Sequence, residues 1–219
     1  MLSQLAGRPL ATCILTISGL KPRLKYRVVI AALKRCATQK QAQHRCCANK
    51  ERMGDTTLRE LVYGKGAHVD PVACVEDVPA ELATRTVDGY PHSMWQIIEH
   101  VNYWMEYDFR KVAGEYPPYP ERAIESWPAH PIPAGEPQWQ ATTRRFEGLL
   151  AQLAALSESD SAKLERVVHN VGSPQSPRQS TVRAMLWQIA AHNSYHIGQI
   201  ALLRRQLRAW PPRRGGDTW

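Results

Sequence analysis

The stretch that decides the fold is STVRAMLWQIAAHNSYHIGQIALLRRQLRA, which covers residues 180–209. Its apolar residues recur at alternating spacings of four and three, which is typical of a helix that packs in a bundle. Two histidines and a glutamine interrupt the middle of this inward face, and burying such polar groups without partners costs on the order of a few kcal/mol. The predicted inward face consists of Met185, Ile189, His192, His196, Gln199 and Leu203.

Capping residues and helix breakers outline the other helices. Ser93 precedes an apolar pattern that runs to about Ala113, and Gly114 is suited to end that helix. Nothing alternates with a period of two, so no sheet is predicted. The other predicted helices are Thr56–Tyr63, Pro71–Asp77, Pro137–Leu156 and a last one, capped by Ser180 or Thr181, that runs to about Ala209.

Seven prolines crowd the segment from Glu115 to Pro137. Proline lacks a backbone donor and clashes with the preceding helical turn, so no helix is predicted there. A connection of this length inside a domain is usually functional or a crossover. The sequence therefore predicts an all-α fold, a four-helix up-down bundle with a long proline-rich crossing loop.

Charge is distributed unevenly along the chain. Residues 1–52 hold eleven Lys or Arg and one acid, whereas residues 53–219 hold seventeen Lys or Arg and nineteen acids. We therefore expect residues 1–52 to be a basic extension, disordered or non-native, with translation starting at Met53, and residues 53–219 to form the helical domain. A basic-tailed nucleic-acid binder is disfavoured, because the domain itself is slightly acidic.

Cysteine usage and hydropathy bear on location. Four of the five cysteines lie within residues 1–52 and the domain keeps only Cys74, which is no disulfide framework and fits a reducing compartment. No apolar run approaches the roughly eighteen residues needed to span a bilayer. The sequence therefore predicts a cytoplasmic protein with neither a membrane nor a nucleic acid as its partner.

A metal site is predicted on the inward face of the 180–209 helix. His192 and His196 are four residues apart, so they project from one face about 6 Å from each other and can chelate one ion. His100, in the helix that starts at Ser93, would supply a third imidazole. Alternatively, each histidine is a hydrogen-bonded core residue of a non-catalytic bundle, with a metal that only staples helices or with none. Imidazole ligands favour Zn or Ni, and Mn or Fe also fit.

Four segments resemble the DinB family, and the resemblance extends over residues 53–212. The run H-x-x-x-H-x-G-Q is its most specific part. The resemblance implies a four-helix bundle, a divalent metal held by His100, His192 and His196, and a homodimer. Many members have Arg where this chain has Ile197, so any role of that Arg is absent here. The segments that carry the resemblance are Leu58–Leu61, Gly64–His68, Pro91–His100 and His192–Gln199.

The ligand set and the resemblance together suggest a metal-dependent enzyme acting on a small molecule. Three neutral imidazoles leave a divalent ion with its full charge and an open position, as in catalytic zinc sites. Such an ion can lower the pKa of a bound water to about 7, or bind a small thiol as its thiolate. The resemblance implies both uses, because some relatives are transferases or isomerases that depend on a low-molecular-weight thiol and others are described as hydrolases. Both reactions stay open at this point.

Other polar residues are interpreted as structural. Glu99 lies on a different face of the helix from its neighbour His100, so it should point away from the metal site. The remaining interpretations are loop positions for His92, His130 and His169, and a solvated surface for Arg204 and Arg205.

Overall fold

The computed structural model describes residues 55–128, 135–168 and 180–216. Within these ranges the chain is mostly helical, as predicted, and none of its helices combines the length and apolarity needed to cross a membrane. The expected N-terminal extension and its boundary at Met53 lie outside the described residues, as do His130 and His169.

Helices account for nearly all the regular structure in the described part of the chain. In chain order, the elements are α2 (Thr56–Val62), α3 (Ala73–Glu76), α4 (Ala80–Ala83), α5 (Met94–Val112), the 3-10 helix η1 (Ala123–Ser126), α6 (Glu136–Ser157), α7 (Ser161–Leu164), β1 (Val167–Val168), β2 (Ser180–Thr181) and α8 (Val182–Gln206).

Helix α5, which carries the first predicted ligand, begins at a capping box. The Ser93 hydroxyl accepts a hydrogen bond from the Gln96 backbone, and the Gln96 side chain accepts one from the Ser93 backbone. Arg110 and Lys111 occupy the last turn, where positive charge complements the helix dipole. Gly114 follows with a φ of 90°, a conformation that glycine adopts readily. The predicted start and end of this helix are confirmed.

Helix α8 carries the histidine pair and is also capped as predicted. The Thr181 hydroxyl accepts a hydrogen bond from the Ala184 backbone, and the helix ends at Gln206, shortly before the expected Ala209. Its inward face is confirmed, because Met185, Ile189, His196 and Leu203 are buried while His192 and Gln199 are half-buried.

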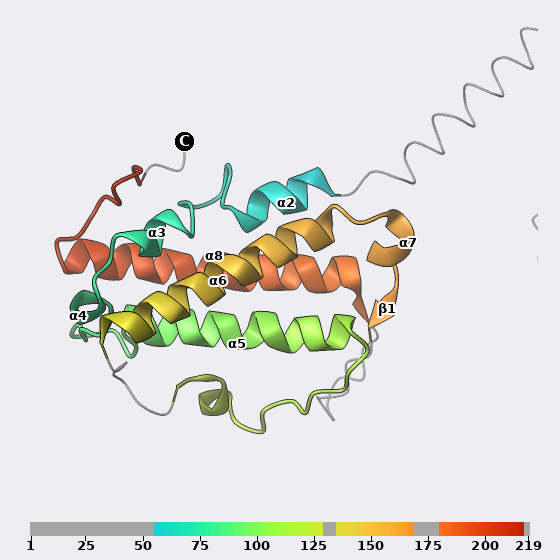
Figure 1. Ribbon diagram of the computed structural model, residues 1–219, viewed down its shortest axis with the longest axis horizontal. Helices are drawn as coiled ribbons and strands as arrows, with labels where there is room; N and C mark the ends of the chain where they lie inside the picture. Colours follow the sequence, from blue (N-terminus) through green and yellow to red (C-terminus); the bar gives the residue numbers. More distant parts are fainter. Residues whose placement is uncertain (1–54, 129–134, 169–179, 217–219) are drawn as a thin grey trace, which may run out of the picture. The chain divides into compact units, whose positions relative to one another are not determined.

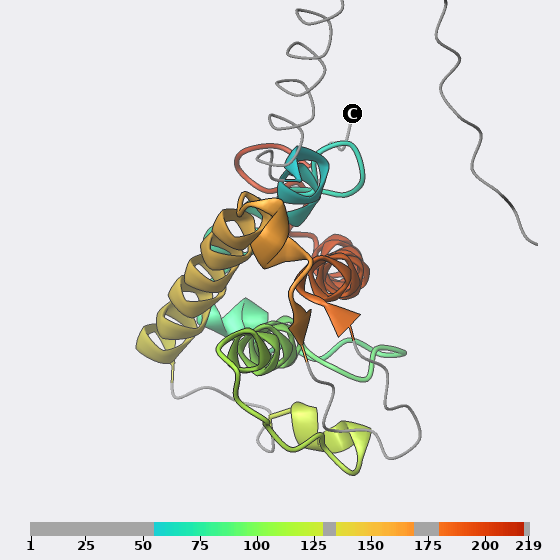
Figure 2. The same ribbon diagram turned by 90° about the vertical axis from the view of Figure 1, so that its right-hand side faces the viewer.

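The long helices enclose a single apolar core. Helix α5 packs against α6 and α8, and the short α2 packs against the same two helices (Figure 1). Seen nearly along the axes of α5 and α8, the four helices are arranged around this core, with α6 inclined to the other two long helices (Figure 2). The largest fully buried side chains include Leu58, Met105, Trp139, Phe146 and Leu150.

Helices α5 and α6 run in the same direction, which departs from the predicted up-down order (Figure 1). Trp95, near the start of α5, donates to Thr142, whereas Glu106, nearer its end, pairs with Arg145, so positions along the two helices increase together. The connection must therefore return along α5, whose nineteen residues span about 28 Å at 1.5 Å per residue. This geometry explains why the crossing loop is long.

Two small elements contradict the predictions. Val167 and Val168 pair antiparallel with Thr181 and Ser180, although no sheet was expected. Two-residue strands are too short to produce a detectable alternation. The helix η1 lies within the proline-rich segment, where no helix was predicted; its four residues contain no proline, and 3-10 helices commonly occur as pieces this short.

Candidate metal centre

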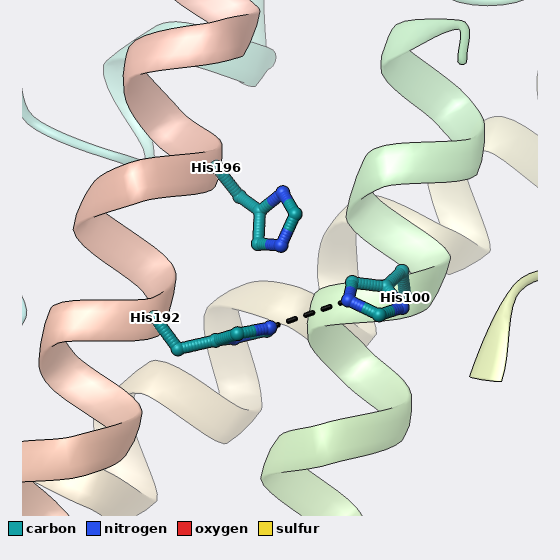
Figure 3. A group of neighbouring side chains, drawn as sticks. All are labelled: His100, His192 and His196. Carbon is teal, nitrogen blue, oxygen red and sulfur yellow. Dashed lines mark hydrogen bonds between the residues drawn. The ribbon is translucent and has the colours of Figure 1, made fainter. Parts of the chain in front are cut away.

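Helices α5 and α8 bring the three predicted ligands together. His100 extends from α5 toward His192 and His196, which project from one face of α8 (Figure 3). Their candidate ligand nitrogens all lie within 4.8 Å of one another. His100 is 7% exposed and His196 5% exposed, while His192 is half-buried. Three imidazoles from two helices thus converge at a site largely shielded from solvent.

The closest approach within this group joins two Nε2 atoms. His192 Nε2 and His100 Nε2 are 3.2 Å apart, a distance at which one nitrogen can donate to the other (Figure 3). The ring centroid of His196 lies 4.8 Å from that of His100 and 4.5 Å from that of His192. When both Nε2 atoms are unprotonated, as the Nδ1 contacts described below favour, their lone pairs face each other, and a cation between the rings would be bound by both.

The orientation of His100 is set from the proline-rich segment. Its Nδ1 lies 3.1 Å from the Ser126 carbonyl oxygen and 3.1 Å from the Ser126 hydroxyl. That hydroxyl donates to Ala123 O, so it can only accept from the imidazole. Both contacts favour a proton on Nδ1, which leaves the Nε2 lone pair free for a metal ion.

Amide oxygens of α8 hold the other two rings. His196 Nδ1 lies 2.7 Å from Gln199 Oε1, and His192 Nδ1 lies 3.4 Å from Asn193 Oδ1. An amide oxygen is only an acceptor, so each contact again favours a proton on Nδ1 and a free Nε2. The third polar residue of the predicted inward face, Gln199, is therefore the hydrogen-bond partner of His196.

An aromatic stack covers His100. The Trp127 ring lies 3.9 Å from the His100 ring, with an interplanar angle of 10°. The His92 ring stacks on the other face of Trp127, at a centroid distance of 3.6 Å and an interplanar angle of 12°. Trp104 meets the edge of His100 at 6.4 Å. Ser126 and Trp127 were not predicted as part of the site. A tryptophan inside a proline-rich loop could have indicated the contact, because such a large apolar side chain is expected to pack against another part of the domain.

Burial keeps the three imidazoles neutral. Burial, with a smaller contribution from the neighbouring histidines, lowers the pKa of His100 and of His196 from 6.5 to about 4. Burial also lowers the pKa of His192. Neutral imidazole is the form that binds a metal ion, so the site is in its ligating state at neutral pH.

The metal-free protein is expected to lose stability as the pH falls from about 6.5 to about 4. In this window the unfolded chain protonates these histidines at their ordinary pKa of about 6.5, while folded His100 and His196 stay neutral. The unfolded state then binds more protons, so the free energy of unfolding rises with pH up to about 6.5 and levels off above it. Denaturant unfolding in chelator across this range measures the slope. The variant His196→Asn should give a shallower slope, and a slope equal to that of the wild type would contradict the prediction.

The residues fit a divalent cation. The cluster consists of three histidines, and no carboxylate belongs to it within the described ranges. Nitrogen donors of this kind suit Zn, Ni, Cu or Fe better than Mg or Ca, which prefer oxygen. Three protein ligands, rather than four, are typical of a catalytic zinc site.

Neighbouring polar groups serve other purposes. As predicted, Glu99 points away from the site, accepting from Thr142 Oγ and pairing with Arg145 of α6. A cavity of about 330 Å³ lies beside this network, lined in part by Trp95 and Pro128, but none of the three histidines lines it. Its charged groups, Glu99 and Arg145, are paired with each other, so the histidine cluster is the stronger candidate site.

Comparison with known proteins identifies the family of the chain. The family model described as the DinB superfamily matches residues 71–200, more than half of the chain, and this range contains all three histidines. No curated protein and no solved structure matched the sequence. The chain belongs to the DinB superfamily.

Proposed function

We propose that this protein is a metal-dependent enzyme whose divalent ion is held by His100, His192 and His196. The observation that carries the proposal is the cluster itself: three neutral, mostly buried imidazoles, each with its Nδ1 beside an oxygen acceptor. Outer oxygens of this kind fix the tautomer and aim of metal-binding histidines. Zn or Ni is the preferred ion, with Mn or Fe as alternatives.

A small thiol is the favoured co-substrate. When bound, the ion would supply Lewis acidity, which lowers the pKa of a thiol or a water in contact with it. Water has the higher intrinsic pKa and usually needs a base to remove its proton, yet no carboxylate joins the cluster in the described part of the chain. A thiol, with a pKa of about 8.5, needs a much smaller shift to lose its proton to solvent.

No cysteine of the described residues can supply this thiol, so a small molecule is its proposed source. Cys74 is the free cysteine of the described residues, and it is fully buried. Burial raises the pKa of its thiol to about 12, so it cannot supply a thiolate near neutral pH. The protein's own contribution is to hold the imidazoles and to shield the site with Trp127 and Trp104.

A thiol-transfer assay tests the proposed function. Full-length protein loaded with Zn or Ni is mixed with a panel of small thiols and electrophiles, and thiol consumption is followed. We expect turnover that the variant His196→Ala loses, whereas the control His68→Ala, whose imidazole bonds to Val69 O away from the site, keeps it. Hydrolysis of an ester panel without thiol transfer would indicate a hydrolase instead. Absence of both activities in metal-loaded protein would contradict an enzyme.

The family assignment also informs the remaining proposals. We propose that α2, α5, α6 and α8 are the four helices of the family's bundle, since these four share the core. A small-molecule substrate, a homodimer and a cytoplasmic location stay predictions from the sequence and its resemblance.

A further inference from the structure

One aromatic side chain connects the proline-rich segment to the candidate ligands. Trp127 follows η1 directly, and its indole lies parallel between the rings of His92 and His100. Its ring also meets the edge of His196 at a centroid distance of 5.8 Å. The preceding residue, Ser126, contacts His100 Nδ1 through both its carbonyl and its hydroxyl. Two consecutive residues of the proline-rich segment therefore constrain the same imidazole.

The two contacts restrain different motions of the His100 ring. The Ser126 oxygens hold one edge of the ring, which directs Nε2 to the opposite side, toward His192 Nε2 at 3.2 Å. An edge contact alone lets the ring plane rock about that edge. The Trp127 indole, parallel to within 10°, resists this rocking by lying flat against one face. Together they fix both the direction and the plane of the ligand.

His92 contributes to the stack by its ring face rather than by polar bonds. Its Nδ1 is buried and has no hydrogen-bond partner among the described residues. Trp127 itself is half-buried, and the His92 ring stacks on it at a centroid distance of 3.6 Å. The stack is thus built as a sandwich, in which His92 holds Trp127 against His100.

We propose that Trp127 is a positioning residue for the metal centre, which keeps the His100 imidazole in the orientation that binds the ion. This inference rests on the proposed metal binding. It assigns the proline-rich crossing loop a role in metal affinity, in addition to its role as a connection between parallel helices. Residues that orient metal-binding histidines typically affect metal affinity by about ten- to a hundredfold.

Cobalt titration of the full-length, metal-free protein tests this role. Co²⁺ is the probe because its visible absorption reports the ligand geometry, a property that a merely structural tryptophan would not change. We expect Trp127→Leu to weaken Co²⁺ binding about tenfold and to alter the spectrum. Trp127→Phe, which keeps a flat ring, should retain most of the affinity and the wild-type spectrum. The control Trp187→Leu, at a tryptophan on α8 that is 40% exposed, should behave as the wild type.

The outcomes separate this inference from the proposed function. A wild-type protein that takes up no Co²⁺, Zn or Ni would refute the metal centre itself. Wild-type affinity and spectrum in Trp127→Leu, or an equal loss in Trp187→Leu, would overturn only the positioning role. Should Trp127→Leu fail to fold, the pair His92→Ala and His92→Phe decides: weaker binding for Ala with recovery for Phe supports the stack, and equal affinities overturn it.

Discussion

Replacing His196 by Ala is expected to weaken metal binding by about 3 kcal/mol, or roughly 150-fold, the share of one ligand in the affinity of a histidine or cysteine site. His196 is 5% exposed and projects toward His100 and His192, so its replacement by Ala removes one of the three candidate ligands. Competition with a chelator of known affinity measures the change. Metal should also raise the melting temperature of the wild type, because it binds only the folded state, and should do so far less for the variant.

The control for this prediction is His68→Ala, which removes a histidine elsewhere in the domain. The His68 ring contacts Val69 O in the turn that follows α2 and takes no part in the cluster. Its replacement should leave metal affinity unchanged. Equal affinities for His196→Ala and the wild type would show that the α8 histidine is a core residue and not a ligand.

The second large effect is expected at Arg204, where Arg204→Leu should lower the free energy of unfolding by about 3–5 kcal/mol. Arg204 is 2% exposed and donates to the carbonyl oxygens of Ala73, Cys74 and Ala209 and to the Asp77 carboxylate. Removing the guanidinium leaves these acceptors without their donor in a largely dry environment. It also removes the side-chain hydrogen bonds that join α3 to the end of α8.

The neighbouring arginine provides a matched control. Arg205 is exposed and lies over the Trp210 ring at 4.0 Å, a contact that is worth about 0.5–1 kcal/mol at an exposed site. Urea unfolding of Arg204→Leu and Arg205→Leu should therefore give clearly different losses. Similar losses for the two variants would contradict the structural role of Arg204.

Features that local chemistry determines could be predicted from the sequence. Ser93 and Thr181 cap their helices because a hydroxyl before an apolar pattern satisfies backbone donors of the first turn. His192 and His196 meet because a four-residue spacing on a helix fixes their separation. His100 joins them because both helices bury the faces that carry these residues.

Features that depend on contacts between distant parts of the chain could not be predicted from the sequence. Ser126 and Trp127 lie far from His100 along the chain, and no periodicity in a proline-rich loop indicates what its side chains cover. The expectation of a solvated surface position is wrong for Arg204, which follows the buried Leu203 on the same helix and reaches α3. The parallel course of α5 and α6 likewise depends on tertiary pairing, since a long loop permits either direction.

The most direct test of the histidine centre is X-ray absorption spectroscopy of full-length protein that has been loaded with Zn and freed of excess metal, with its metal content measured in the same sample. The three-histidine site predicts about one Zn per chain, with nitrogen donors at about 2.0–2.1 Å and the outer-ring scattering of three imidazoles. The variant His196→Ala should lose most of this metal. A wild-type protein that retains no stoichiometric Zn, or whose Zn shows no imidazole scattering, would contradict a metal centre formed by His100, His192 and His196.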